Sequence, residues 1–484
     1  MPELRADARE RLRAAARDYL AVELPKLDSA GLLPRPGRDN PWIDWERLWS
    51  FDRAATDTDL ARLLVTEAPD RWSSPAPQIG AGELVGALLR GAVASATLEA
   101  SQPGHAPSSV ALIDQFLEQV ANADQPVRVI RLVTDVDVSE VEGRTVHNVR
   151  LRRVRGLPET LQAEMFEAAS EVRGLRTMVS YGSREPRAFL VGEQAGRDPW
   201  LVAHSLRPHL IHVSTALRLV TAASLIEPLE VYGQPQMVHT GGPVATAVDP
   251  DHASYWRRVS IVRSEQLVGL EAIATQICEL DKRPSEKIPP PIAVAISRFN
   301  RSHRGAAWAD VVIDIAIGLE AALSTGEKDE ITLRIRNRVA HLLARPGDSP
   351  ADLFGDVGEL LTIRGTVAHG DIVPPKRWAG LFEARGLTQV MVEDRRSVLF
   401  DRWRDILRRA ILARLLLAAG GASWTLRRPP GAGVDATLIN PAERRRWRGI
   451  IRRRAAELGI PSAIDRPPVL RDFLHDPYGD RLDN

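Results

Sequence analysis

The chain has 484 residues, 44% of them hydrophobic and 26% charged, a balance typical of a soluble globular protein with two or three domains. Its 64 basic and 63 acidic residues leave a net charge of +1, which excludes a strong overall positive field as the means of attracting nucleic acid. A single cysteine, Cys278, excludes an intramolecular disulfide and a cysteine-based zinc site, and the lack of a leader or a long apolar run predicts a reduced, cytoplasmic setting with no membrane partner.

Residues 1–285 are expected to form an α+β region. Apolar residues at helical spacing predict helices over residues 2–24, 82–100, 108–122 and 209–224. Alternation of apolar and polar residues predicts strands over residues 127–138, 145–154, 176–181 and 188–192. The first two of these strands flank Glu142-Gly143 and are expected to pair with each other as a hairpin.

Three histidines, His204, His209 and His212, lie close together in the sequence near the last helix of this region. Imidazole is a common metal ligand, so these residues could hold a metal ion. Because the sequence offers no clear carboxylate partner nearby, unrelated histidines are the favoured interpretation. We therefore predict no metal site and no cofactor, and we expect Cys278 to be a thiol buried in the core.

The next domain, over residues 286–420, is predicted to be helical. Pro284 and the run Pro289-Pro290-Pro291 mark its start, because proline ends one helix and can begin another. Helices are expected over residues 291–303, 307–324, 328–345, 351–370 and 395–419, with a longer loop over residues 371–394. Residues 421–484 are expected to form a basic C-terminal tail with one helix, over residues 441–454.

Two segments of the helical domain carry an arginine and, after four residues, a histidine. They are Arg364 to His369 and Arg336 to His341. A guanidinium grips a phosphate with a fixed fork of donors, and an imidazole transfers protons near neutral pH. Together these two groups are sufficient to cleave RNA without a metal, so each pair is a candidate site.

Helical phase favours the pair Arg364 and His369. At roughly 100° per residue, Arg364 falls in the middle of an apolar stripe, whereas Arg336 and His341 lie off the stripe of their own helix. The stripe around Arg364 consists of Leu353, Val357, Leu360, Leu361, Val367 and Ala368. A charge there must face a carboxylate, another subunit or a bound anion, because an unpaired charge in an apolar surface is costly.

Two interpretations of this pair stay open. In the first, Arg364 forms an ion pair with Asp314 or Glu320 and His369 only ends the helix, since Gly370 is a plausible residue just past the helix end. In the second, the two side chains form a catalytic site. Five residues advance a helix by roughly 140°, so the second interpretation is easiest when two copies of the chain meet in a symmetric dimer.

Three ordered features of the helical domain resemble the HEPN superfamily, specifically its Apea-like branch. They are an apolar helix that ends in Gly-Leu-Glu-Ala-Ala-Leu over 318–323, a helix of the form LRIRNRVAHLL over 333–343, and a helix that closes on Arg-x4-His-Gly over 364–370. The resemblance covers about residues 291–420. It implies a helical bundle that dimerises and, in many members, a metal-independent endoribonuclease with an Arg-x4–6-His motif.

On this chain the resemblance places the catalytic motif on Arg364 and His369, with Asp314 and Glu320 as supporting residues. The residue after the motif arginine is usually polar in the family and is Gly365 here, whereas Arg336 is followed by Asn337. Arg336 and His341 are therefore the backup pair.

The function implied by the resemblance is cleavage of RNA by attack of a 2′-hydroxyl on the neighbouring phosphate, in an antiviral defence effector or toxin. Residues 1–285 would then be a sensor or regulator. The alternative is a non-catalytic HEPN domain that binds a nucleotide or a partner and holds the dimer together.

The basic helix predicted over residues 441–454 is a second candidate contact for RNA. Its side chains could bind phosphates while the tryptophan stacks on a base. The residues concerned are Arg444, Arg445, Arg446, Trp447 and Arg448. A solvated helix face, or docking of this helix onto an acidic surface, explains the same composition.

Overall fold

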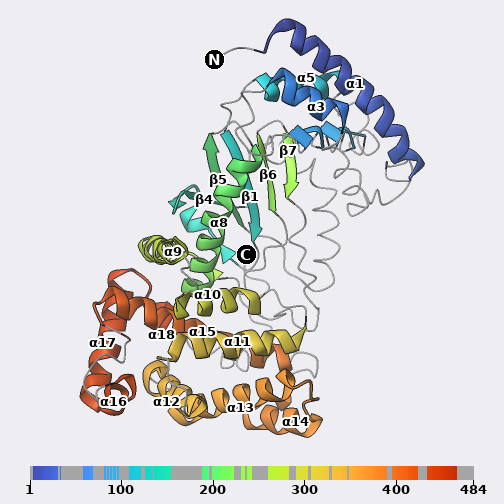
Figure 1. Cartoon of the computed structure of the whole chain (residues 1–484). Coiled ribbons are helices and arrows are strands. Elements are labelled where there is room, and N and C mark those ends of the chain that lie inside the picture. Colours follow the sequence, from blue (N-terminus) through green and yellow to red (C-terminus); the bar gives the residue numbers. More distant parts are fainter. Residues whose placement is uncertain are drawn as a thin grey trace. The chain divides into compact units, whose positions relative to one another are not determined.

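The computed structural model describes a large part of the chain. It comprises residues 4–30, 33, 58–68, 81–82, 84–86, 88–89, 91–93, 95–96, 108–121, 126–133, 136–153, 188–195, 199–222, 230–234, 237–241, 260–282, 290–303, 307–325, 330–345, 348–389, 395–422, 424 and 433–465. The described residues are mainly helical, with a small antiparallel sheet whose strands come from the N-terminal half (Figure 1). None of the described helices is long and apolar enough to span a membrane.

The chain divides into two compact units, which are considered separately. The first unit consists of Met1–Leu132, Asn148–Leu210 and Glu227–Val244. The second consists of Val133–His147, Ile211–Ile226 and Ala245–Asn484. The domain boundaries expected near residues 285 and 420 stay predictions, because residues 283–289 and 425–432 lie outside the described part.

The sheet of the first unit confirms three predicted strands, over residues 127–138, 145–154 and 188–192, but not the pairing predicted for the first two. Its strands follow the order β4, β5, β1, β6, β7 and are β1 (Pro126–Val133), β4 (Val149–Arg153), β5 (Ala188–Ala195), β6 (Glu230–Gln234) and β7 (Met237–Gly241). The hairpin predicted around Glu142-Gly143 is wrong. β1 pairs antiparallel with β6, with Arg131 opposite Glu230, and β4 pairs with β5. Alternation of apolar and polar residues locates a strand but does not identify its partner, and the β6 partner of β1 lies about a hundred residues away in the sequence. The strand predicted at 176–181 is outside the described residues.

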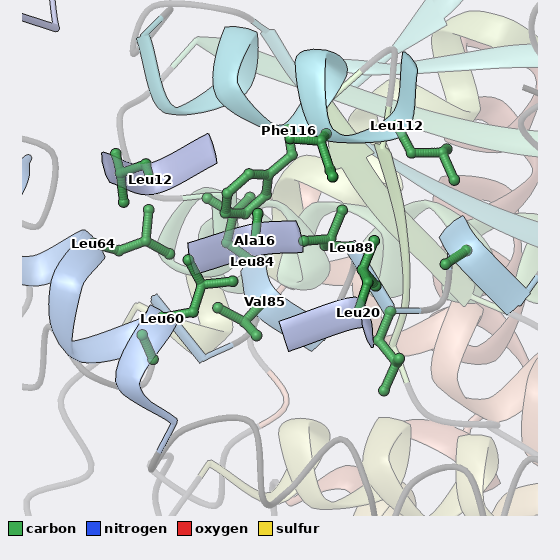
Figure 2. Packing of buried hydrophobic residues seen from close by; sticks show 14 of the residues in the cluster. Leu12, Ala16, Leu20, Leu60, Leu64, Leu84, Val85, Leu88, Leu112 and Phe116 are labelled. Atoms are coloured by element: carbon green, nitrogen blue, oxygen red, sulfur yellow. The ribbon is translucent and has the colours of Figure 1, made fainter. Parts of the chain in front are cut away.

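Helices of the first unit enclose an apolar cluster. They are α1 (Ala6–Ser29), α3 (Asp59–Glu67), α5 (Ser109–Ala121) and further helical residues within 81–96. Leu12, Leu64 and Phe116 come from three different helices and point into the same cluster (Figure 2). Burial of these side chains is what holds the short helices together, because isolated helices of this length are marginal in water.

The second unit contains the helices predicted for the C-terminal domain. They are α10 (Pro291–Ser302), α11 (Trp308–Leu323), α12 (Ile331–Leu343), α13 (Pro350–Ala368) and α15 (Arg395–Ala419). Their bounds agree with the predicted ranges to within about three residues, since prolines begin α10 and α13 and glycine follows α13. A mainly helical unit is common to many folds, so the HEPN-like bundle stays a prediction.

One helix of the second unit was predicted as loop. Residues Pro375–Ala384 form α14, within the segment 371–394. Pro374 and Pro375 begin the helix, and Trp378, Leu381 and Phe382 are buried at the spacing of one helical face. The aromatic rings explain the helix, because Trp378 packs edge-on against Trp308 and stacks on Phe382.

Further elements complete the second unit. They are β2 (Val136–Asp137), β3 (Thr145–Val146), β8 (Ser260–Ile261), α9 (Leu267–Asp281), α16 (Val434–Ile439), α17 (Pro441–Glu457) and α18 (Pro461–Asp465), while α8 (Pro199–Thr221) crosses from the first unit into the second. Cys278 on α9 is buried, as predicted. The predicted basic helix is confirmed as α17, which begins at Pro441 with Asn440 as its cap.

Buried arginines run along α15 and are held by distant backbone. Arg404 donates to the carbonyl of Ser302 at 2.6 and 3.1 Å. Arg408 donates to the carbonyls of Leu219 and Ala463 at 2.7 and 2.8 Å. Charges this deeply buried persist only when they are paired and hydrogen-bonded, so this arginine network of α15 determines how the surrounding segments fit.

Candidate functional site

Arg364 lies near the C-terminal end of α13, where the buried stripe of this helix gives way to solvent. Leu360 and Ile363 are buried, whereas Val367 is half-buried and Ala368 is exposed. The last turn therefore projects beyond the apolar core, contrary to the predicted stripe. The Arg364 side chain is 37% exposed, which makes it accessible to a ligand.

The partner of Arg364 within the chain is Glu320 on α11. Their Nη2 and Oε2 atoms are 3.9 Å apart, within ion-pair range but too far for a hydrogen bond. Asp314, the other predicted partner, is engaged elsewhere, because its Oδ1 accepts from Arg298 at 2.7 Å. A half-exposed pair at this distance contributes little to stability, and an incoming phosphate could compete with Glu320 for the guanidinium.

His369 ends α13 and is exposed to solvent. Gly370 follows with a φ of 79°, and its amide donates to the carbonyl of Val367 at 3.0 Å. The amide of Asp371 donates to the carbonyl of Thr366 at 3.0 Å, so the two bonds close the helix in the manner expected of a glycine at this position. The imidazole is thereby carried on a rigid helix end and faces solvent.

Gly365 is compatible with an open site. A Cβ atom built on Gly365 would meet no other atom within 4 Å. The lack of a side chain at Gly365 thus leaves open space at this position, one residue after Arg364.

The backup pair Arg336 and His341 is separated by its contacts. Arg336 donates from Nε to the carbonyl of Phe354 at 3.1 Å, and its guanidinium carbon lies 3.8 Å from the centre of the Phe354 ring. His341 faces α17 instead, where its Nδ1 is 3.0 Å from Nη1 of Arg444. The two side chains are therefore directed to different neighbours and do not share a site within the chain.

The contact of His341 with Arg444 affects its protonation. Burial lowers the pKa of His341, and the nearby charges of Arg444 and Arg448 lower it further. A neutral imidazole can accept a hydrogen bond from the Arg444 guanidinium at Nδ1, which assigns the proton to Nε2. His341 is thus part of the contact between α12 and α17.

The five predicted nucleic-acid contacts on α17 fall into two groups. Arg445 and Arg446 are exposed, and Arg446 lies 3.6 Å from Glu443. Arg444, Trp447 and Arg448 are only partly exposed, and Trp447 packs against Trp424 with ring centres 5.5 Å apart. Stacking of Trp447 on a base would require Trp424 to yield, so phosphate contacts by the exposed arginines are the simpler use of this helix.

Arg338 is a buried charge that the sequence analysis missed. Its side chain is 1% exposed, forms a two-pronged pair with Asp435 at 2.7 Å and donates to the carbonyl of Leu323 at 2.7 Å. The signal was present, because Arg338 follows Ile335 by three residues and so falls on the apolar stripe of α12. Its role is to fasten α16 to α12.

Two histidines of the second unit could supply ligands to a metal ion. The ring centres of His147 and His212 are 5.7 Å apart, and burial lowers the pKa of His147. Nε2 of His212 lies 2.6 Å from Oδ2 of Asp281 on α9. The carboxylate partner that the sequence did not reveal is therefore Asp281. Metal-binding histidines are commonly held in orientation by such a carboxylate on their second ring nitrogen.

Comparison of the chain with models of protein families, with curated proteins and with solved structures finds no match.

Proposed function

We propose that this protein is a metal-independent endoribonuclease that uses Arg364 and His369 from two copies of the chain. The observation that supports the proposal is the accessibility of both groups at the end of α13. Arg364 keeps a long contact with Glu320 and His369 faces solvent, whereas Arg336 and His341 are held by neighbouring helices.

The proposed reaction follows from the chemistry of the two groups. One imidazole removes the proton of an RNA 2′-hydroxyl, and the oxygen attacks the adjacent phosphorus. The bond to the 5′-oxygen then breaks, and the imidazolium formed in the first step donates its proton to the leaving oxygen. Arg364 stabilises the charge on the phosphorane, and the products are a 2′,3′-cyclic phosphate and a 5′-hydroxyl end.

A second copy of the chain is part of the proposal, because roughly 140° of helical rotation separates the two side chains on one helix. Ile372, three residues after His369, is 88% exposed, so an apolar side chain stands beside the proposed site. A symmetric dimer could place Arg364 of one copy near His369 of the other.

The runner-up function is a non-catalytic HEPN-like domain that binds a nucleotide or a partner and holds a dimer together. It is supported by the contact of Arg364 with Glu320, which gives the arginine a structural explanation without any substrate.

The test is incubation of the full-length protein with labelled RNA in EDTA. The variants are His369→Ala and Arg364→Ala, with His341→Ala as the matched control that carries the same substitution in the other Arg-x4-His segment. We expect His369→Ala to lower the cleavage rate by about 10²–10⁴-fold and His341→Ala to change it by less than about threefold. Cleavage that survives His369→Ala and disappears with His341→Ala would overturn the site.

The shared site is tested by mixing inactive variants. If each site joins Arg364 of one copy to His369 of the other, a mixture of the two alanine variants regains about a quarter of the wild-type rate, because half of the dimers are mixed and carry one intact site of two. No recovery in a mixture with confirmed subunit exchange excludes this arrangement. Absence of cleavage by the wild-type protein, together with a stable dimer, supports the binding domain.

A further inference from the structure

A small cavity in the second unit is lined by four arginines from three parts of the chain. Arg345 follows α12, Arg409 lies on α15, and Arg448 and Arg452 lie on α17. The remaining lining is apolar and consists of Leu342, Leu343, Ala344, Ala413, Ile451 and Ile464. The space free of protein atoms is about 380 Å³, part of it open to solvent. None of these described lining residues is acidic.

Two carboxylates contact the lining arginines from outside the cavity. They compensate only part of the positive charge of these arginines. Asp405 is 3.3 Å from Arg345 and 3.1 Å from Arg409. Asp348 is 3.4 Å from Arg345 and 3.2 Å from Arg409. Both carboxylates are less than a tenth exposed, and neither lines the cavity.

The charge balance of this group is positive. Asp405 is shared with Arg408, at 2.8 Å, in addition to its two cavity arginines. Arg345, Arg408 and Arg409 thus share Asp348 and Asp405, which leaves an excess of one positive charge among these five residues. Burial lowers the pKa of Arg409 and of Arg448, as expected where cations are removed from water without full compensation.

Two hydrogen-bond donor atoms of the lining arginines also have no acceptor among the described residues. The Arg345 side chain is 5% exposed, and within the described residues its Nη1 has no hydrogen-bond partner. The same holds for Nε of Arg448. A buried guanidinium donor without an acceptor is costly, so an acceptor bound in the cavity that these two arginines line would relieve this cost.

We propose that this cavity binds a phosphate group as a tetrahedral oxyanion. Guanidiniums reach the cavity from α15, from α17 and from the end of α12, so acceptors are needed in several directions. A tetrahedral phosphate offers oxygens in such directions, whereas a carboxylate offers two in one plane. The apolar part of the lining and the modest space fit a single phosphate group, either free or at the end of a small nucleotide.

Binding at this site joins three helices. The bound phosphate links α17 to α12 and α15 and satisfies Nη1 of Arg345. The site is distinct from Arg364 and His369, whose residues do not line the cavity.

The experiment uses the full-length protein in phosphate-free chloride buffer. Inorganic phosphate and ATP are titrated separately by calorimetry, and the melting temperature is followed at constant ionic strength. The test variant is Arg448→Gln/Arg452→Gln. The matched control is Arg453→Gln/Arg454→Gln, which removes the same charge from positions of the same helix that do not line the cavity.

We expect saturable binding of phosphate or ATP and a rise in melting temperature with ligand concentration. The test variant should bind at least about tenfold more weakly and the control within about twofold of wild type. Displacement of phosphate by ATP identifies the terminal phosphate of a nucleotide as the ligand, and binding of phosphate alone identifies the free ion. His369→Ala should bind as wild type does, which separates this site from the proposed ribonuclease site. No saturable binding of either probe up to about 10 mM, or equal weakening in the control, overturns the proposal.

Discussion

The ends of α13 and α12 carry the same Arg-x4-His spacing in opposite surroundings. On α13, Arg364 is 37% exposed with a partner at 3.9 Å. On α12, Arg336 is fixed against the carbonyl and ring of Phe354, and His341 is turned to Arg444. The difference teaches that the spacing of a motif leaves accessibility undetermined. What determines accessibility is whether another helix crosses over the motif.

The largest expected effect is a difference in the free energy of unfolding between an arginine variant on α12 and one on α13. Replacing Arg338 on α12 by Met leaves Asp435 and the carbonyl of Leu323 without their main donor, so we expect a loss of about 3 kcal/mol in the free energy of unfolding. Replacing Arg364 by Met should change it by less than about 0.5 kcal/mol, because its ion pair is long and half-exposed. Urea unfolding of both variants measures the difference. Equal losses would mean that Arg364 is as tightly held as Arg338.

A pair of glycines on α13 gives a second, smaller contrast. A Cβ on Gly358 would lie 2.8 Å from the guanidinium carbon of Arg336, so Gly358→Ala should displace the end of that side chain, and after the helix propensity gained by alanine we expect a net cost of up to about 1 kcal/mol. Gly365→Ala meets no atom and replaces a helical glycine, so it should stabilise by up to about 1 kcal/mol. Thermal unfolding of the two variants checks the sign of each change. A destabilised Gly365→Ala protein would show that the space beside Arg364 is occupied.

The smallest expected effect is on the pH dependence of stability. Burial first, and then Arg444 and Arg448, keep the pKa of His341 below 6.5 in the folded state. Between that lowered value and about 6.5 the unfolded chain binds more protons, so the contribution of His341 to stability is present above about pH 6.5 and is lost as the pH falls. His341→Gln should flatten the stability profile below about pH 6.5. His369→Gln is the control, and a profile unchanged by His341→Gln would mean that burial and the two arginines do not govern the protonation of His341.

The sequence predicted the helices of the C-terminal half well because local signals mark their ends. Proline at 291 and 350, and Gly370 with a positive φ, begin or end helices by backbone geometry alone. The pairing of β1 with β6 could not be predicted in this way, because it depends on a segment about a hundred residues away. The helix α14 was not predicted because it depends on the packing of Trp378 on Trp308, a contact between residues far apart in the sequence.

The candidate site was predictable only in part. Helical phase predicted Arg364 within an apolar stripe and Arg336 off one, whereas the core ends before Val367 and Arg336 packs against Phe354. The same test, applied to Arg338, would have found the buried charge. No pattern in the sequence could reveal that α17 lies against His341, or that Trp424 covers Trp447.

The arginine network of α15 has a consequence for how the second unit loses its structure. Arg404 and Arg408 are held by carbonyls that lie 55 to 189 residues away in sequence. Guanidiniums stay charged at all accessible pH values. If a segment that supplies one of these carbonyls detaches, the buried guanidinium of Arg404 or Arg408 loses its acceptor. Partial opening is therefore penalised, and the segments around Leu219, Ser302 and Ala463 are expected to separate from α15 together, in one cooperative transition of the second unit.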